Sequence, residues 1–202
     1  MSVFVYFGKE ITDIFQDFLK LNFHTENAKL GTYLIIATIP AAIIGFFLKN
    51  INIFHNITII ALGFGITGIL LIIASLNIKI RKQKLNIKNS LIIGIAQIFS
   101  LFPGISRSGA TISTGILSGL SEKAALKFSF IMSIPIIFGA NILVIGNQTL
   151  PSELIWATLV SFMVGLLTLH ILYTKILTSK KNLRYFGIYA LLLAIILGIF
   201  LR

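Results

Sequence analysis

Long runs of apolar residues, separated by short polar and basic stretches, dominate the chain. Five of these runs contain no Lys, Arg, Asp or Glu, and each is long enough to cross a hydrocarbon core about 30 Å thick. They are Gly31–Leu48, Ile57–Ile78, Phe128–Gly146, Leu154–Tyr173 and Tyr185–Leu201. The pattern predicts an all-α membrane protein, with residues 1–202 forming a single polytopic domain.

The segment Ser90–Leu120 differs from these runs because a polar group divides it. An apolar arm, Ser90–Phe102, is followed by Pro103, a polar stretch and a second apolar arm. With a helical rise of about 1.5 Å per residue, the first arm is only about 20 Å long, which is too short to cross alone. The two arms could form one broken helix that crosses once. They could also form a re-entrant hairpin over 90–120, which enters and leaves the membrane on the same side.

The distribution of basic residues favours the hairpin. With a hairpin, eleven basic residues fall on one side of the membrane and two on the other; with a single crossing, the counts become six and seven. The eleven are Lys79, Arg81, Lys82, Lys84, Lys88, Lys123, Lys127, Lys175, Lys180, Lys181 and Arg184. Because basic residues accumulate in short cytoplasmic loops, we expect a helical bundle with a re-entrant hairpin and with its basic loops in the cytoplasm.

Composition supports the assignment to membrane proteins and bears on which partners the chain binds. The chain is 56% hydrophobic and 11% charged, with a mean hydropathy of +0.97, whereas soluble domains are about 25% charged. A net charge of +11 could suggest nucleic acid, but the basic residues stand in short clusters between apolar runs. We therefore expect a membrane partner and no nucleic acid. The sequence has no cysteine, which excludes disulfides and thiolate metal sites.

Arg107 is the only charged residue within any segment predicted to lie at membrane depth. Burying an arginine there costs at least about 2.5–3.5 kcal/mol, so its presence suggests a function. Ser106, Ser108 and Thr111 supply hydroxyl groups near it, while Gly104 and Gly109 lack side chains that would keep an anion from the backbone. A helix beginning near Ser106 would direct free N–H groups toward the loop. An arginine can also bind phosphate oxygens through two parallel hydrogen bonds.

The residues alone leave three interpretations of this loop open. The first is a phosphate-binding site centred on Arg107. The second is a contact between helices rich in small residues, with Arg107 paired to a backbone carbonyl. The third is the broken helix of a transporter that binds an anion near the membrane midplane.

The run Gly94–Ile112 (GIAQIFSLFPGISRSGATI) carries a resemblance that separates these interpretations. Together with Lys127–Phe130, Ser133–Pro135 and Lys29–Leu48, it is similar to the undecaprenyl-diphosphate phosphatase family, also called bacitracin-resistance proteins. The similar residues extend through essentially the whole chain. The family fold is an inverted repeat with two re-entrant hairpins, so this chain resembles the second half of that fold preceded by part of the first.

The resemblance implies a hydrolase that converts undecaprenyl diphosphate to undecaprenyl phosphate plus phosphate, which recycles the lipid carrier of cell-wall synthesis. It implies catalytic roles for Arg107, Ser106, Ser108 and Thr111. Substrate binding would involve Arg107, Gly104, Gly109 and Gln97, although a lone buried amide such as Gln97 is also typical of a hydrogen bond between helices. The implied location is the bacterial plasma membrane, with the active site toward the outer face. Homo-oligomer formation is left open.

The chain departs from the family in one respect. The family's first motif, a Glu-rich stretch followed by a Pro-x-Ser-Ser-x-Gly-His loop, has no counterpart here, and we expect the chain to lack the amino-terminal part. The family implies a divalent cation, Mg²⁺ or Ca²⁺, whose ligands we do not find in this chain, since all six acids lie outside the predicted spans. The activity of this chain alone is thus left open. The alternative function is non-catalytic binding or transport of a polyprenyl phosphate or other anionic lipid.

Overall fold

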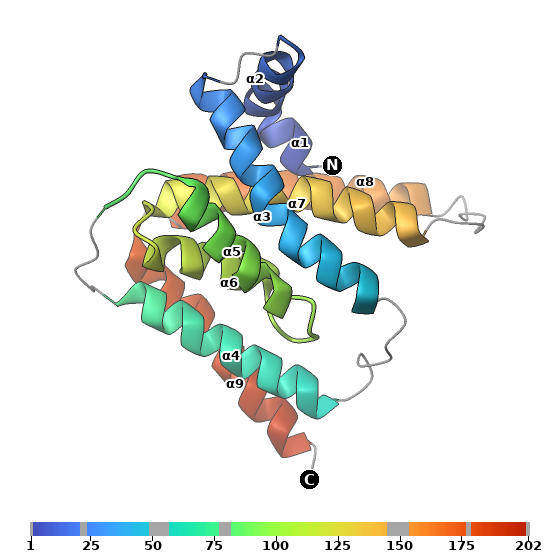
Figure 1. Ribbon diagram of the computed structural model, residues 1–202. Helices are drawn as coiled ribbons and strands as arrows, with labels where there is room; N and C mark the ends of the chain where they lie inside the picture. Colours follow the sequence, from blue (N-terminus) through green and yellow to red (C-terminus); the bar gives the residue numbers. More distant parts are fainter. Residues whose placement is uncertain are drawn as a thin grey trace.

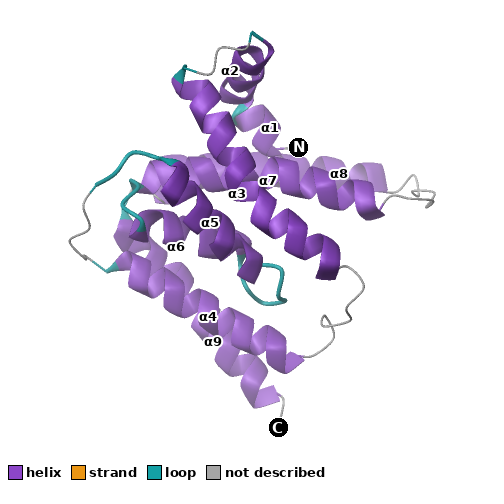
Figure 2. Ribbon diagram, viewed as in Figure 1, coloured by secondary structure: helices purple, strands orange, loops and turns teal. Residues whose placement is uncertain are grey.

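The computed structural model describes residues 2–20, 24–48, 57–76, 82–144, 154–176 and 179–200. In this part of the chain, helices and turns account for the secondary structure and no strand occurs (Figure 2). The helices are α1 (Ser2–Tyr6), α2 (Gly8–Leu19), α3 (Glu26–Leu48), α4 (Ile57–Ser75), α5 (Ile87–Phe99), α6 (Arg107–Leu117), α7 (Glu122–Val144), α8 (Leu154–Ile171), η1 (Leu172–Ile176), η2 (Lys180–Asn182) and α9 (Leu183–Phe200).

The predicted spans correspond to helices whose ends differ by a few residues. Four helical stretches are long and apolar enough to cross a membrane, namely Glu26–Leu48, Ile57–Ser75, Leu154–Thr174 and Lys180–Phe200. The remaining prediction, Phe128–Gly146, falls in α7, which begins earlier, at Glu122. Polar residues at the starts of α3 and α7 continue the helix beyond the apolar run, which the hydrophobic pattern alone could not show. The predicted loops 49–56 and 147–153, together with Lys79, Arg81 and Arg202, lie outside the described residues.

Helix pairs build the fold around the short helix α6. In Figure 1, α4 runs along α9 and α3 runs along α5. Helix α6 contacts α4, α5 and α7, and α1 packs on α8. The positions of α6 are therefore enclosed by neighbouring helices rather than exposed at the edge of the fold.

Small side chains allow α6 to be enclosed in this way. Most of its residues from Gly109 to Ile116 are buried although few of them are large and apolar. A Cβ on Gly115 would stand 2.9 Å from the Cβ of Ala125 in α7, so the two helices meet with almost no side chain between them. Such close approach is typical of helix packing in membranes. There the hydrophobic effect does not hold helices together, and small residues permit the close van der Waals packing that does.

Helices α5 and α6 have the geometry of a hairpin. The backbone N–H of Gln83, before α5, donates to the carbonyl of Gly119, after α6, at 2.9 Å. The residues between Phe99 and Arg107 form the turn at the opposite end (Figure 2). The two arms thus start and finish at one end of the bundle, as the sequence predicts; their re-entry into a membrane stays a prediction.

Basic residues gather at the end where the hairpin begins. Two adjoining hollows, which share Lys82, bring together the starts of α3, α7 and α9, the end of α4 and the segments flanking α5 and α6. The basic residues that line them are Lys29, Lys82, Lys84, Lys127, Lys180, Lys181 and Arg184. We call this the basic end. The gathering of basic residues at this end agrees with the charge distribution from which the hairpin was predicted.

An ion pair at the basic end connects α2 to α7. The Lys127 Nζ lies 2.9 Å from Glu10 Oε1. Partial burial raises the pKa of the Glu10 carboxyl, but the hydrogen bond from Lys127 and the charges of Lys127 and Lys9 outweigh burial, so the pKa is lowered overall. The pair is partly exposed to solvent, and pairs of this kind contribute about 0–1 kcal/mol.

Large apolar side chains cover the outside of the bundle. Trp156 and Phe47 are 73% and 72% exposed, and only 6% of the span in α8 is buried. Water-soluble monomers rarely expose continuous apolar surface of this extent. The outer surface is therefore suited to contact with lipid, and the chain is a helical membrane protein.

Candidate functional site

The turn between α5 and α6 is fixed by its packing on α4. Gly104 has φ = +85°, a conformation that residues with a side chain rarely adopt, and a Cβ there would meet the carbonyl oxygen of Ile60. A Cβ on Gly63 of α4 would in turn meet the carbonyl of Pro103 and stand 2.7 Å from the carbonyl carbon of Gly104. Backbone thus lies directly on backbone, and the turn has little freedom to move.

Helix α6 begins directly after Ser106, close to the start that the sequence predicts. Ser106 is the N-cap residue, and its Oγ accepts a hydrogen bond from the Gly109 N–H at 3.1 Å. The Ser108 hydroxyl lies 3.4 Å from that of Ser106. The N–H groups of Arg107 and Ser108 have no partner within the helix, as in the first turn of any α-helix, and none elsewhere in the described chain. This end of α6 therefore offers two free N–H groups, two hydroxyls and the positive end of the helix dipole.

The Arg107 side chain turns back to α5 and binds Gln97. Its Nε and Nη2 both donate to Gln97 Oε1, at 2.9 and 2.6 Å. Gln97 is only 1% exposed, so these bonds hold one edge of the guanidinium group in a fixed position. The remaining N–H groups of Arg107, including both on Nη1, have no partner among the described residues. The predicted hydrogen bond between helices at Gln97 is present, and its partner is Arg107 itself.

Arg107 has no counter-charge in the described part of the chain. The ion pairs described there are Lys29–Glu26 and Lys127–Glu10. Gln97 satisfies hydrogen bonds of the guanidinium group but is neutral. A partly buried cation bonded only to a neutral amide is electrostatically unsatisfied, and a bound anion would satisfy it.

The site lies at the depth of the middle of α4. The Ser106 N–H donates to Thr67 Oγ1 at 2.9 Å. Thr67 stands ten residues after the first residue of α4 and eight before the last, so it is about 15 Å and 12 Å from the two ends. An anion at Arg107 would therefore bind near the midplane of a membrane that α4 crosses.

Thr67 and Gly63 were not predicted, although they position the loop. Thr67 Oγ1 receives the Ser106 N–H and itself donates to the Gly63 carbonyl at 3.0 Å, within α4. The two residues are four positions apart, so they lie on the same face of an apolar helix. Small residues with this spacing indicate a close contact with another helix. The sequence could have shown that this face packs closely, but it could not show against which segment.

The structure does not bring the Thr111 hydroxyl into the loop. Thr111 is 1% exposed; its Oγ1 bonds the Arg107 carbonyl at 2.8 Å and lies 2.6 Å from the Ser129 hydroxyl of α7. Both contacts hold α6 in place, and the catalytic role expected for Thr111 stays a prediction. The glycines likewise have a packing role: Gly104 lies against α4, and a Cβ on Gly109 would be 3.0 Å from Thr67 Cγ2.

A divalent cation does not fit the described residues at this site. No group of three or more Asp, Glu or His side chains lies together in the described ranges. The described side chains near Arg107 are hydroxyls, the Gln97 amide and the guanidinium cation. Hydroxyl and amide oxygens can bind Mg²⁺ or Ca²⁺, but no carboxylate among them offsets the positive charge of Arg107, which favours an anion. We therefore assign no step to a metal ion.

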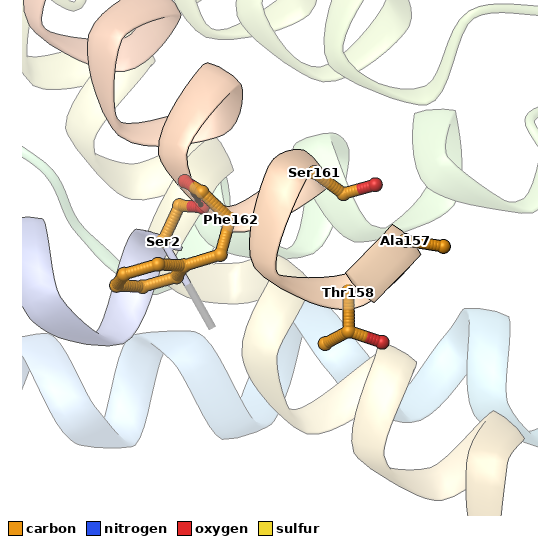
Figure 3. Close-up of a pocket in the computed structure, with 5 residues that line it drawn as sticks. All are labelled: Ser2, Ala157, Thr158, Ser161 and Phe162. Atoms are coloured by element: carbon orange, nitrogen blue, oxygen red, sulfur yellow. Dashed lines mark hydrogen bonds between the residues drawn. The ribbon is translucent and has the colours of Figure 1, made fainter. Parts of the chain in front are cut away.

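Another hollow, on α8, lacks the features of a chemical site. It has a volume of about 320 Å³ and is lined by Ser2, Ala157, Thr158, Ser161 and Phe162 (Figure 3). The Ser2 hydroxyl donates to the Phe162 carbonyl at 2.9 Å, which fixes α1 on α8. No titratable side chain lines this hollow, so we place the candidate site at Arg107.

Fold and site together define a polytopic helical membrane protein with a helix hairpin that carries a candidate anion-binding site. The family model for bacitracin resistance protein BacA matches residues 1–196, and the chain belongs to that family. Similar proteins include the undecaprenyl-diphosphatase of Thermosipho melanesiensis, 40% identical over 200 residues, which cover 96% of this chain and 77% of that protein. Those of Caldicellulosiruptor bescii and Methanococcus vannielii are 37% and 34% identical, each with 77% of its length covered.

Proposed function

We propose that this chain takes part in the hydrolysis of undecaprenyl diphosphate to undecaprenyl phosphate and inorganic phosphate, and that Arg107 binds the diphosphate. The observation that carries the proposal is Arg107 itself: a partly buried cation, held by Gln97, with free N–H groups and no carboxylate partner among the described residues. The relatives named undecaprenyl-diphosphatase supply the substrate and the reaction.

The residues around Arg107 can hold a phosphoryl group in a defined orientation. The free edge of the guanidinium group can donate two parallel hydrogen bonds to phosphate oxygens. The N–H groups of Arg107 and Ser108, with the hydroxyls of Ser106 and Ser108, can bind further oxygens at the start of α6. During hydrolysis, water attacks the terminal phosphorus and the phosphoanhydride bond breaks, leaving undecaprenyl phosphate. Donors placed in advance would stabilise the negative charge that shifts to the oxygens in this step.

We further propose that the protein lies in the plasma membrane with the basic end toward the cytoplasm. Basic residues are retained on that side during membrane insertion. The turn of the α5–α6 hairpin faces away from the basic end, so the substrate headgroup would reach Arg107, near the midplane, from the outer face. The polyprenyl chain would extend along the exposed apolar surface of the helices.

Release of inorganic phosphate from undecaprenyl diphosphate by the purified chain in detergent tests the proposed function. We expect release by the parent protein and a reduction of at least about a hundredfold for Arg107→Ala, the size of effect seen when one donor to a developing charge is removed. Lys88→Ala, which removes an exposed cation at the start of α5, is the control and should act like the parent. Equal release by Arg107→Ala and the parent would refute the role of Arg107. Tight binding without release by the parent would refute hydrolysis and favour the alternative, a lipid-binding protein.

A further inference from the structure

A second site with anion-binding chemistry lies at the basic end, outside the α5–α6 hairpin. It is a hollow of about 630 Å³ between the end of α4, the start of α7 and the start of α9. Its lining residues are Ser75, Leu76, Lys82, Glu122, Ser179, Lys180, Lys181, Arg184 and Tyr185. The Ser75 end of α4 is eight residues from Thr67, so this hollow is about 12 Å farther along α4 than the Arg107 site.

The charges around the hollow are unbalanced. Lys82, Lys180, Lys181 and Arg184 face it, against a single carboxylate, that of Glu122. None of these residues takes part in the ion pairs found in the described part of the chain, which are Lys29–Glu26 and Lys127–Glu10. Like charges that share a hollow repel one another, and an anion placed among them would remove that repulsion.

The backbone at the start of α9 favours the same sign of ligand. Ser179 caps the helical turn η2, and its Oγ accepts the Lys181 N–H at 3.4 Å. Helix η2 continues directly into α9, so the positive end of a dipole 21 residues long points to the hollow. Lys181 and Arg184 stand three apart on this first turn. Charged side chains and helix dipole thus act together on a ligand bound here.

The surface next to the hollow is apolar and exposed, which indicates the class of ligand. Tyr185, Tyr189 and Leu192 of α9 are 72%, 63% and 53% exposed, and their spacing places them along one face of the helix. Tyrosine is enriched where a membrane meets water, with its ring at headgroup level. A molecule with a phosphate in the hollow could therefore lay acyl chains along this face of α9.

We propose that this hollow binds the phosphate group of an anionic phospholipid at the basic surface of the membrane. Lys181 and Arg184 are the principal contacts, with Lys82 and Lys180 adding charge. The site is independent of the proposed hydrolysis, because its basic residues belong to η2, to α9 and to the loop before α5 rather than to the hairpin turn. A bound lipid would fix the start of α9 against α4 and α7.

Binding of short-chain phosphatidylglycerol to the full chain in neutral detergent, measured by native mass spectrometry, tests the proposal. The double variant Lys181→Gln/Arg184→Gln should bind at least about tenfold more weakly, since each basic residue near the surface contributes about 1 kcal/mol. The control Lys20→Gln/Lys88→Gln removes the same charge from exposed positions outside the hollow and should stay within about twofold of the parent. Phosphatidylcholine should bind weakly to all of them.

Three results would overturn the proposal. Equal losses in the two double variants would mean that binding reflects only the diffuse charge of the basic end. Loss of phosphatidylglycerol binding in Arg107→Ala would place the lipid in the hairpin instead. Displacement of phosphatidylglycerol by millimolar inorganic phosphate, with phosphate binding as tightly as the lipid, would show that the hollow recognises a soluble phosphate. Unchanged binding in Arg107→Ala and no displacement by phosphate would support the lipid site.

Discussion

Replacing Gln97 by glutamate tests whether the charge of Arg107 is what binds the diphosphate. Gln97 Oε1 now accepts two hydrogen bonds from Arg107, at 2.9 and 2.6 Å, and a glutamate of the same length can accept both. Both hydrogen bonds from Arg107 are kept, but the guanidinium group gains a carboxylate as counter-charge. The variant therefore changes the electrostatics of the site with little change of shape.

The size of the effect follows from the short distance between the groups. Two unit charges about 4 Å apart attract each other by about 4 kcal/mol at an effective dielectric constant of about 20. Burial of the new carboxylate offsets part of this attraction. We expect Gln97→Glu to weaken binding of undecaprenyl diphosphate by at least about a hundredfold, or about 2.7 kcal/mol. The thermal unfolding midpoint should not fall.

A matched variant separates charge from hydrogen bonding. Gln97→Met has a similar volume but no acceptor, so Arg107 keeps its charge and loses its fixed position. Loss of a hydrogen bond to a charged group costs about 1.5–3 kcal/mol, so we expect a lower unfolding midpoint and roughly tenfold weaker binding. Circular dichroism and lipid-diphosphate titration of the same samples measure both quantities. If Gln97→Glu binds the diphosphate as tightly as the parent, the charge of Arg107 is not the source of recognition.

The remaining predictions concern the support of the loop, the basic end and the topology. Thr67→Val should lower the free energy of unfolding by about 1–3 kcal/mol, because the Ser106 N–H loses its acceptor, whereas Thr67→Ser should not; thermal melts compare them. The Glu10 carboxyl has a lowered pKa in the folded state, so its stabilising contribution is complete above the unfolded pKa and is lost as pH falls through the folded pKa. Glu10→Gln should therefore cost up to about 1 kcal/mol at pH 7 and almost nothing in acid, and an equal cost at both pH values would contradict the ion pair. A cysteine at Ser152 should react with an impermeant reagent from outside intact cells and one at Ser179 should not; the reverse pattern, or labelling of both, would reject the hairpin in the membrane.

The local sequence was sufficient to predict the long helices and the start of α6. In lipid, an apolar run must satisfy its backbone N–H and C=O groups within itself, which a helix does. The helices α3, α4, α8 and α9 can therefore be predicted from local sequence. The cap at Ser106 also follows from local chemistry, since serine accepts the free N–H groups of a first helical turn.

The contacts between helices could not be predicted in the same way. The contact of the Thr111 hydroxyl with Ser129 of α7 depends on the rotation of α6 about its axis, which the local sequence does not show. Thr67 was missed because its partner is 39 residues away in the chain, and no local pattern identifies that partner. The rotation of α6 and its contact with α4 both depend on tertiary packing, which no single segment determines.

The dissociation constant of undecaprenyl diphosphate for the parent, Arg107→Lys and Arg107→Ala tests the central claim most directly. Lysine keeps the positive charge but cannot make two parallel hydrogen bonds to phosphate, so we expect Arg107→Lys to bind more weakly than the parent and Arg107→Ala to bind more weakly still. Circular dichroism should show the same helix content in all three proteins. Equal dissociation constants for Arg107→Ala and the parent would contradict the account, and would mean that the hairpin turn has only a structural role.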